Sequence, residues 1–462
     1  MTSVPHPLDR VLVETLAPGV VYAVGGRVRD EFRSNLDGTI APPKDLDYVV
    51  TGLAIEELIA RLRSVGRLDV VGASFSVVKF RHEAGEADIA LPRRERSTGV
   101  GHKDFEVASG PDIPIEDDLG RRDFRMNMIA RRLSDGAIVD PYGGVADIAA
   151  RRIDIVTPQT FAEDPLRMLR AAQFAARFRF ALSPATRSAM TAAAAAVTTI
   201  SPERVGEELS KLLGTAAAPS EGLEILRETG ILAHIWPELL EGVDVDQNEY
   251  HAYDVYRHNL VTLDATPPGD LTLRLAALLH DVGKPRTKDG PHFYRHEHVG
   301  ADLIPVMLGR LRLPNETVET VGHLVRQHMY RADPDLAPRA IRRFIQRARP
   351  EHLDRLFALR AADITGSGIP KRGNVNEYFQ SRVAEILAEA PPFSVKDLAV
   401  GGTDVIALLK KHGAAPADFE GDARVGQILK ILFESVTDDP TRNTAAVLLA
   451  EAESLIVAAP SA

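Results

Sequence analysis

The chain contains no cysteine among its 462 residues, so disulfide bonds and cysteine-ligated zinc are excluded. Long apolar runs are missing as well, and no stretch is long enough to span a bilayer. Residues 1–11 lack the basic segment followed by an apolar stretch that marks a secretory signal. Together these absences predict a cytoplasmic protein that makes no membrane contact.

Basic charge is also scarce, because 55 Lys and Arg residues face 65 Asp and Glu residues, for a net charge of −10. Dedicated nucleic-acid binders usually carry a basic surplus, so this balance argues against a general binder of that class. It remains compatible with a local basic surface. Residues 331–349 hold six arginines and two aspartates. On its own this stretch is interpreted equally well as a solvated helix face or as an RNA contact.

The chain is long enough for about three domains. Up to about residue 155, short apolar segments between Gly-, Pro- and Asp-rich turns predict strands at residues 20–24, 46–50, 77–81, 87–91 and 138–139. From about Phe161 onward, apolar residues recur at helical spacing to the C-terminus. The expected fold class is α+β, with a small head of mixed sheet and helices followed by an all-helical body.

The first chemical pattern is a pair of glycines, Gly25 and Gly26, between the first predicted strand and a helix. Glycines let the backbone approach an anion closely, and the start of a helix offers it unpaired N–H groups. Arg29 comes within one turn, where its guanidinium could bind phosphate. Alone, the pattern is more typical of an ordinary turn, and it indicates a phosphate site only in combination with further motifs.

Two carboxylates come next, because Asp45 and Asp47 stand two apart at the start of an apolar strand. Alternate residues of a strand point to one face, so both carboxylates are expected on the same side. Such a pair is costly to bury without a cation, and hard divalent ions take oxygen ligands. We therefore predict a metal site that holds a nucleoside triphosphate. Asp88 is either a third catalytic carboxylate from a neighbouring strand or a structural residue.

A cluster of polar groups is present at Arg121, Arg122, Asp123 and Asn127. Adjacent arginines suit phosphate groups, and a carboxylate can accept a hydrogen bond from a ribose hydroxyl. This segment is therefore predicted to contact the nucleotide.

Asp164 and Arg167 are expected to read the base. Pro165 suits the first turn of a helix, and residues three apart share a helix face. A carboxylate only accepts hydrogen bonds and a guanidinium only donates them. Cytosine and adenine pair an amino donor with a ring acceptor, whereas guanine and uracil place a carbonyl oxygen where the amino group should be. That mismatch costs about 1–3 kcal/mol, which favours C and A. A helix cap with its partner is the structural alternative.

These motifs occur in order, with Asp-Pro-Tyr-Gly-Gly at residues 140–144 preceding residues 163–167. The succession resembles the class II CCA-adding enzymes and bacterial poly(A) polymerases of the DNA polymerase beta superfamily. The resemblance extends over residues 22–213. It implies a polymerase-beta-like nucleotidyltransferase head that adds C, C and A to the 3′ end of tRNA from CTP and ATP.

The resemblance also assigns roles to individual residues. It implies Mg²⁺ at Asp45 and Asp47. Residues 93–103, which include Gly99 and Gly101, are interpreted as a mobile loop that helps to switch from C to A addition. Residues 201–209 match a helix-stabilising motif and are interpreted as structural. Gly25, Gly26 and Arg29 are implied to contact the triphosphate, and Arg122, Asp123 and Asn127 the sugar. Asp164 and Arg167 are implied to contact the base, and Glu163 and Arg170 to orient these two side chains.

A second set of metal-ligand residue types is spread over about a hundred residues further along. Its centre is His280–Asp281, at the end of an apolar helix that a glycine stops. The order resembles that of the HD phosphohydrolase superfamily, with His258, His280, Asp281, His296, His328 and Asp363 as the matching residues. His296 is preferred to His298 because the Gly-Ala pair after it fixes the register.

The second resemblance implies a divalent transition metal, such as Ni²⁺ or Mn²⁺, and phosphatase or 2′,3′-cyclic phosphodiesterase activity on RNA ends. Four domains are expected: a nucleotidyltransferase head (1–155), a helical neck with the base-selecting motif (156–245), an HD domain (246–390) and a helical tail that contacts tRNA (391–462). The oligomeric state is left open.

Three alternatives remain. A poly(A) polymerase would share every motif of the head. A CC-only or A-only tRNA nucleotidyltransferase would also share them. An HD hydrolase with an inactive head is the least favoured, because the carboxylate pair is intact.

Overall fold

The computed structural model describes residues 5–38, 46–71, 77–97, 105–369, 375–389 and 391–458. Asp45 and residues 98–103 therefore lie outside the described residues. The chain divides into two compact units, Met1–Leu240 and Glu241–Ala462.

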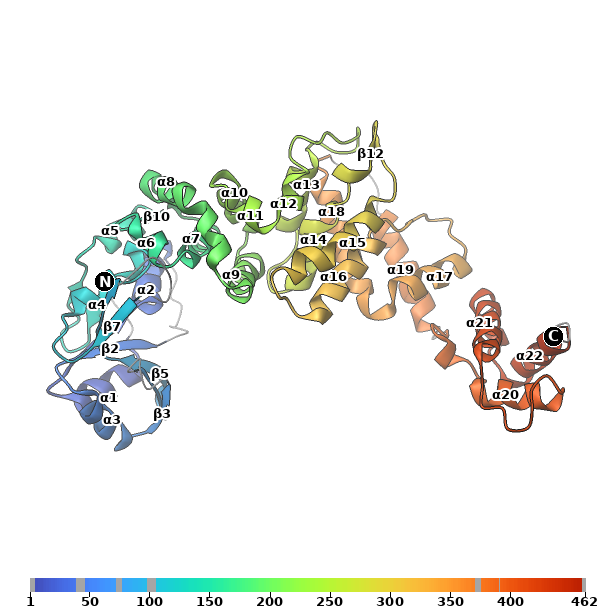
Figure 1. Ribbon diagram of the computed structural model, residues 1–462, viewed down its shortest axis with the longest axis horizontal. Coiled ribbons are helices and arrows are strands. Elements are labelled where there is room, and N and C mark those ends of the chain that lie inside the picture. Colours follow the sequence, from blue (N-terminus) through green and yellow to red (C-terminus); the bar gives the residue numbers. More distant parts are fainter. Residues whose placement is uncertain are drawn as a thin grey trace. The chain divides into compact units, whose positions relative to one another are not determined.

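Seven of the described strands form one mixed sheet in the first unit, in the order β3-β4-β5-β2-β1-β8-β9 (Figure 1). Their bounds are β1 Val20–Val24, β2 Asp47–Thr51, β3 Arg67–Val71, β4 Val77–His82, β5 Gly85–Ala90, β8 Ala130–Arg132 and β9 Ile138–Val139. Strands β2 and β5 run parallel, and the other neighbouring pairs run antiparallel. The mixed sheet expected of an α+β head is confirmed.

Helices pack on this sheet through regularly spaced apolar side chains. Helix α1 (Pro7–Leu16) contacts both β1 and α3 (Ile55–Arg63). It buries Leu8, Leu12 and Leu16 completely, and this spacing of four places them on one helix face. The two helices are drawn side by side in blue in Figure 1. This packing fixes β1, the strand that leads into the Gly25–Gly26 turn.

The expectation that residues 93–103 form a loop is wrong for the first five of them, and the mobility of the segment stays a prediction. Arg93–Ser97 forms strand β6, which pairs antiparallel with β7 (Phe105–Ser109) in a separate two-stranded sheet. The sequence pattern also failed to indicate β3 and β8. These segments are rich in charged residues, so their apolar pattern is weak, and pairing with a neighbouring strand decides their conformation instead.

The rest of the first unit is mostly helical. Its elements are α4 Ile115–Gly120, α5 Gly144–Ala149, α6 Gln159–Glu163, α7 Leu166–Phe178, α8 Pro184–Ala193, α9 Pro202–Thr215, α10 Pro219–Glu228, α11 Leu232–Ile235, α12 Pro237–Leu240 and the parallel pair β10 Arg152–Ile153 and β11 Ala181–Leu182. Helix α7 packs against both α9 and α10. Its apolar face, which includes Met168 and Ala172, is buried, so the segment predicted to read the base lies at the start of a helix that is packed on two others.

The second unit is built from helices, with one short antiparallel hairpin of strands β12 Lys288–Asp289 and β13 His292–Phe293. The helices are α13 Val255–Asp264, α14 Leu271–Leu279, α15 His296–Gly309, α16 Asn315–Gln327, α17 Pro338–Ala348, α18 Leu353–Gly366, α19 Val375–Ala388, α20 Gly402–Lys411, α21 Ala423–Asp438 and α22 Ala445–Ala458. Helix α14 is buried along 273–279 and contacts α13, α16 and α18. This central position explains why it is almost wholly apolar.

The basic stretch at residues 331–349 joins two parts of the second unit. In α17, Arg342 is buried and donates hydrogen bonds to the carbonyls of Thr437 (2.6 Å) and Asp438 (2.7 Å). A guanidinium at the C-terminal end of α21 satisfies carbonyls that lack partners inside the helix. Arg343 also pairs with the Asp438 carboxylate at 3.0 Å. Neither of the two sequence interpretations of this stretch described these contacts.

Within the described ranges, no helix combines the length and hydropathy that crossing a membrane requires.

Candidate active sites

The Gly25–Gly26 turn lies against the predicted carboxylate strand. Gly25 has φ +69°, and a Cβ atom there would lie 3.1 Å from Arg122 Nη1 and 3.5 Å from Asp47 Oδ2. Glycine is therefore needed both for the backbone conformation and for the close approach of two charged groups. The structure thus brings together three residues that lie far apart in the sequence.

Asp47 begins β2, and its partner across the parallel pair with β5 is Asp88. Paired residues on adjacent strands present their side chains to the same face of a sheet. Asp47 is partly exposed and Asp88 is exposed, so both carboxylates are accessible from outside. Asp45 is not among the described residues. The role of Asp88 stays a prediction, but its position beside Asp47 is established.

A buried chain of polar contacts runs beside this turn. Arg29 Nη1 donates to Asn127 Oδ1 (2.9 Å), and Asn127 Nδ2 donates to Asp123 Oδ1 (2.8 Å). Asp123 Oδ2 then accepts from Arg170 Nε at 2.8 Å. Arg29 also donates from Nε and Nη2 to the Asp30 carboxylate. Four residues predicted to bind the nucleotide are therefore connected in one network, and the Arg29 guanidinium braces it.

The protonation of this network follows from its pairing. Burial alone would raise the pKa of Asp123, but Arg170, Asn127 and the Phe124 N–H hold that pKa below its usual value. Burial likewise would lower the pKa of Arg170, and the Asp123 carboxylate raises it above the usual value. Asp123 is therefore ionised at neutral pH and can only accept hydrogen bonds.

Asp118 is a site residue that sequence reasoning missed. It lies on α4, is fully buried, and accepts from Arg121 Nε (3.0 Å) and Arg122 Nη2 (3.1 Å). Burial would raise its pKa, but the two arginines lower it below the usual value. Asp118 therefore fixes the directions of both guanidinium groups, including the one that faces Gly25. Three consecutive acidic residues, 116–118, precede this arginine pair in the sequence, and nothing there singles out the third.

One residue of the pair predicted to read the base, Asp164, contacts a third charged residue, Arg204. Asp164 Oδ2 lies 3.2 Å from Arg204 Nη2, on helix α9. Arg167 Nη1 donates to Glu163 Oε2 at 3.0 Å, and its Nη2 donates to the main-chain carbonyl of Arg121 at 2.8 Å. Asp164 and Arg204 remain about a quarter and a third exposed. The helix at residues 201–209 was interpreted as purely structural, yet it supplies Arg204 to the carboxylate that is predicted to choose the base.

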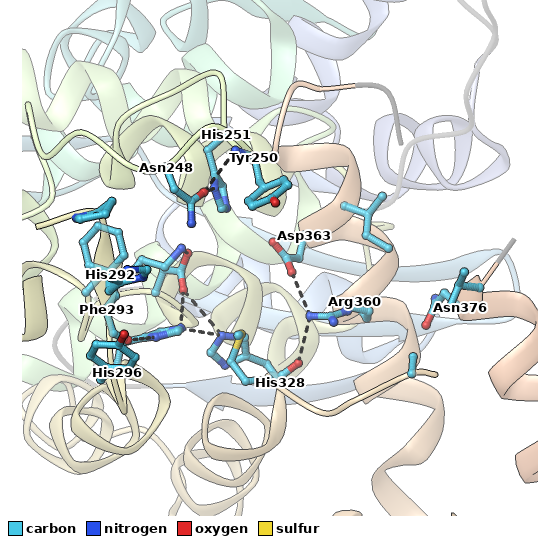
Figure 2. Close-up of a pocket in the computed structure, with 18 residues that line it drawn as sticks. Asn248, Tyr250, His251, His292, Phe293, His296, His328, Arg360, Asp363 and Asn376 are labelled. Atoms are coloured by element: carbon cyan, nitrogen blue, oxygen red, sulfur yellow. Dashed lines mark hydrogen bonds and ion pairs between the residues drawn. The ribbon is translucent and has the colours of Figure 1, made fainter. Parts of the chain in front are cut away.

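The second candidate site lies where five helices of the second unit meet. His258 is on α13, His280 and Asp281 come directly after the end of α14, and His296 opens α15. His328 caps the end of α16, and Asp363 lies near the end of α18. Figure 2 shows His296, His328 and Asp363 around one cavity. The structure therefore brings all six residues of the predicted set together.

Five of the six residues form two groups of possible metal ligands that share Asp281, and the sixth, Asp363, has its Oδ1 3.3 Å from His258 Nε2. His258, His280 and Asp281 form the first group, and Asp281, His296 and His328 form the second. In the first, Asp281 Oδ2 lies 3.3 Å from Nε2 of both histidines. In the second, Asp281 Oδ1 lies 3.2 Å from His296 Nε2 and 3.6 Å from His328 Nε2. Each group suits one divalent ion, with the Asp281 carboxylate between the two.

The imidazole rings are oriented by main-chain carbonyls. His280 Nδ1 lies 2.9 Å from Ala277 O, His296 Nδ1 lies 2.7 Å from Phe293 O, and His328 Nδ1 lies 2.6 Å from Val325 O. A carbonyl can only accept, so each ring carries its proton on Nδ1 and leaves Nε2 free to bind metal. This outer support is typical of histidine ligands to metals.

The cavity around these ligands has a volume of about 470 Å³. Lys284 and Arg360 supply positive charge to it; Lys284 Nζ lies 2.6 Å from Asp281 Oδ2, and Arg360 Nη1 lies 3.6 Å from Asp363 Oδ2. His251 also lines the cavity and can form a ligand group with His258 and Asp363, which the sequence did not indicate. His298, the alternative to His296, contacts Arg326 instead.

Three family models match the chain. Residues 21–154 match the poly A polymerase head domain, and residues 260–365 match the HD domain. Residues 179–242 match a model described as the probable RNA and SrmB-binding site of polymerase A. The matches thus include the Gly25 turn, Asp47 and the Asp118–Asn127 segment of the first site, and five of the six predicted ligands of the second.

Solved structures share the fold. The CCA-adding enzyme of Bacillus stearothermophilus in complex with CTP matches with a TM-score of 0.67 at 23% identity, over 98% of both chains. The CCA-adding enzyme of Thermotoga maritima complexed with tRNA matches with a TM-score of 0.54 at 20% identity, over 97% of this chain and 95% of the other. A nucleotidyltransferase head followed by helical domains is therefore the fold of this chain.

Sequence relatives give the family. The multifunctional CCA protein of Nitrosococcus oceani is 38% identical over 367 residues, which cover 76% of this chain and 86% of the relative. The multifunctional CCA protein of Cupriavidus metallidurans is 39% identical over 322 residues, which cover 67% of this chain and 74% of the relative. The resemblance inferred from the head and HD motifs is confirmed, and the chain belongs to the multifunctional CCA protein family.

Proposed function

We propose that the first unit adds C, C and A to the 3′ end of tRNA, using CTP and ATP as substrates. The convergence of the Gly25 turn, Asp47 and Arg122 beside the buried Asp123–Asn127 pair is the observation that carries this proposal. The relatives are named for the same activity. The test is incorporation of labelled CTP and ATP into tRNA transcripts that end at the discriminator base, at C or at CC.

The reaction joins the 3′-hydroxyl oxygen of the tRNA to the α-phosphorus of the nucleotide. The bond from that phosphorus to the bridging oxygen breaks, pyrophosphate leaves, and the hydroxyl group loses its proton. Asp47, with Asp45 as its predicted partner, would hold Mg²⁺, which neutralises the charge on the entering and leaving oxygens. The Arg122 guanidinium, held by Asp118 at 3.1 Å, presents fixed positive charge to the triphosphate beside Gly25.

The same geometry is compatible with the alternative polymerase activities. Long A tails on RNA other than tRNA would indicate a poly(A) polymerase. Addition that stops after CC, or that occurs only on transcripts ending in CC, would indicate a specialised enzyme.

We propose that Asp164 and Arg167 choose the base and that Arg204 positions Asp164. Replacing Asp164 by Ala removes the acceptor for the cytosine amino group. The incorporation of UTP relative to CTP is therefore expected to rise about tenfold to hundredfold. Arg204→Ala keeps the Asp164 carboxylate but removes the guanidinium that contacts it. We therefore expect a smaller rise in the incorporation of UTP relative to CTP. Glu207→Ala, an exposed residue of the same helix α9, is the matched control. Unchanged base selection in Asp164→Ala would contradict this role.

We propose that the second unit is a metal-dependent phosphohydrolase that acts on RNA ends. Its donor set fits divalent transition metals, because four imidazole Nε2 atoms face the oxygens of the Asp281 carboxylate in a buried site. Ni²⁺ or Mn²⁺ bound there would lower the pKa of a water molecule and stabilise charge on phosphate oxygens.

In the hydrolysis of a 2′,3′-cyclic phosphate, the water oxygen bonds to phosphorus, one ring P–O bond breaks, and the released ribose oxygen takes a proton. Lys284 and Arg360 attract the phosphate.

Metal binding at this site is expected to weaken as the pH falls. Burial would lower the pKa of His258, but Asp281 and Asp363 raise it to about 9 in the metal-free protein. His258 is therefore protonated at neutral pH, and its proton must leave before the ring binds metal. Affinity for Mn²⁺ should fall about tenfold for each pH unit below that pKa if one proton is released. Titration calorimetry from about pH 6.5 to 8.5 measures the affinity for Mn²⁺ at each pH. Repeating it in buffers of different ionisation heat gives the number of protons that are released when the metal binds. A pH-independent affinity would contradict this assignment.

We further propose that the functional segments are the head (1–155), the neck with the base-selecting motif (156–245), the HD domain (246–390) and a tail (391–462) that contacts tRNA. The helical tail and the match of 179–242 to an RNA-binding model support these assignments.

A further inference from the structure

The mouth of the HD cavity holds two large aromatic side chains that metal-dependent hydrolysis does not require. Tyr250 is 60% exposed and Tyr294 is 66% exposed, and both line the cavity. Tyr294 comes directly after the β12–β13 hairpin, and Tyr250 precedes α13. Exposed aromatic side chains at the rim of a polar site commonly serve binding rather than stability.

The cavity has two parts. The metal-ligand residues and the two cations form its polar floor, and Tyr250 and Tyr294 form its aromatic rim. The metal-ligand residues Asp281, His296 and Asp363 lie together with Lys284 and Arg360. At the rim, the Tyr294 ring is stacked on His292, with a centroid distance of 5.3 Å and an interplanar angle of 27°. Figure 2 labels Tyr250, Asp363, His292 and His296 among the side chains that line this cavity. A ligand with its phosphate on the floor would therefore meet flat aromatic surfaces at the rim.

We propose that Tyr250 and Tyr294 stack on the terminal nucleobase of the substrate, so that the site selects nucleoside-bearing phosphates over base-free phosphate esters. This inference rests on the proposed phosphohydrolase function. Stacking on an aromatic ring tolerates every base, because each base has a π-face. Such tolerance suits a site that must accept RNA ends of any sequence. The cavity volume of about 470 Å³ is also within the range of about 300–1,000 Å³ typical of small-molecule sites.

The experiment compares two substrates that share their reacting group. Cytidine 2′,3′-cyclic phosphate carries the base, and methyl riboside 2′,3′-cyclic phosphate carries a methyl group instead. The Mn²⁺-loaded wild-type protein should prefer the cytidine ester by about tenfold to hundredfold in kcat/KM. Tyr250→Ala and Tyr294→Ala should each lose most of this preference through KM, while hydrolysis of the methyl riboside ester stays unchanged. Tyr→Phe variants at both positions should keep the preference.

The control is Tyr378→Ala, because Tyr378 is 48% exposed on α19 but does not line the cavity. A second readout does not require turnover: NMR saturation transfer from the protein to the base protons of cytidine 2′-monophosphate. The two alanine variants should reduce this transfer and Tyr378→Ala should not. Retained substrate preference or retained transfer in the alanine variants would overturn the proposal. Absence of hydrolysis of either ester by wild type would overturn the phosphohydrolase function instead, and the transfer measurement would then decide the stacking on its own.

Discussion

Asn in place of Asp47 is expected to reduce nucleotide addition to tRNA by about a thousandfold or more. The amide keeps the size of the side chain but loses the negative charge that would hold Mg²⁺ next to the Gly25 turn. Because Asp47 begins β2 and is only partly buried, the substitution should leave the sheet intact. The measurement is single-turnover incorporation of labelled CTP into tRNA transcripts, with circular dichroism to show that the variant is folded.

The matched control is Asp69→Asn. Asp69 is an exposed carboxylate on β3 of the same sheet, paired with Arg81 rather than with the Gly25 turn. We expect this variant to add nucleotides at the wild-type rate. Hydrolysis at the HD site should be unchanged in both variants, because that site lies entirely in the second unit. If Asp47→Asn still extended tRNA at a rate near that of wild type, the assignment of the first site would be wrong.

The second large effect is expected for Asp281→Asn. Asp281 belongs to both ligand groups, with one carboxylate oxygen facing each. Its substitution should therefore remove the metal held by these two groups and reduce hydrolysis of cyclic phosphate by about a thousandfold or more. Metal content after dialysis, measured by mass spectrometry, reports the loss without relying on activity. Nucleotide addition should stay at the wild-type level.

A comparison with His328→Ala tests whether the two groups are separate. His328 belongs only to the second group, so this variant should lose about half of the metal held by the two groups, whereas Asp281→Asn should lose the metal of both. Equal and complete loss in both variants would indicate a single ion held by all the ligands. Full metal retention in Asp281→Asn would contradict the shared carboxylate itself.

The sequence predicted the parts of each site that lie within local motifs. The strand at residues 20–24 and the turn after it were predicted correctly because apolar alternation and glycine pairs are local signals. The ligand set of the HD site was predicted from the order of its residue types, and the structure brings all six together.

The sequence did not reveal contacts made by charged residues outside the motifs. Asp118, Arg204 and His251 each act on a group that lies elsewhere in the sequence or on another element. A charged residue on a helix has the same local pattern whether it faces solvent or a buried partner. The sharing of Asp281 between two ligand groups was equally hidden, because a ligand order gives no distances. These features are set by tertiary packing.

The carbonyl supports of the HD histidines have a consequence for how the site can vary. The acceptors at positions 277, 293 and 325 are main-chain oxygens, which every amino acid provides. No side-chain replacement at those three positions can delete the acceptor, provided that the backbone keeps its path. The protonated nitrogen of each ring is thus specified by backbone geometry alone. The residues at these three positions can therefore be substituted while the Nε2 atoms of the three histidines remain available to bind metal.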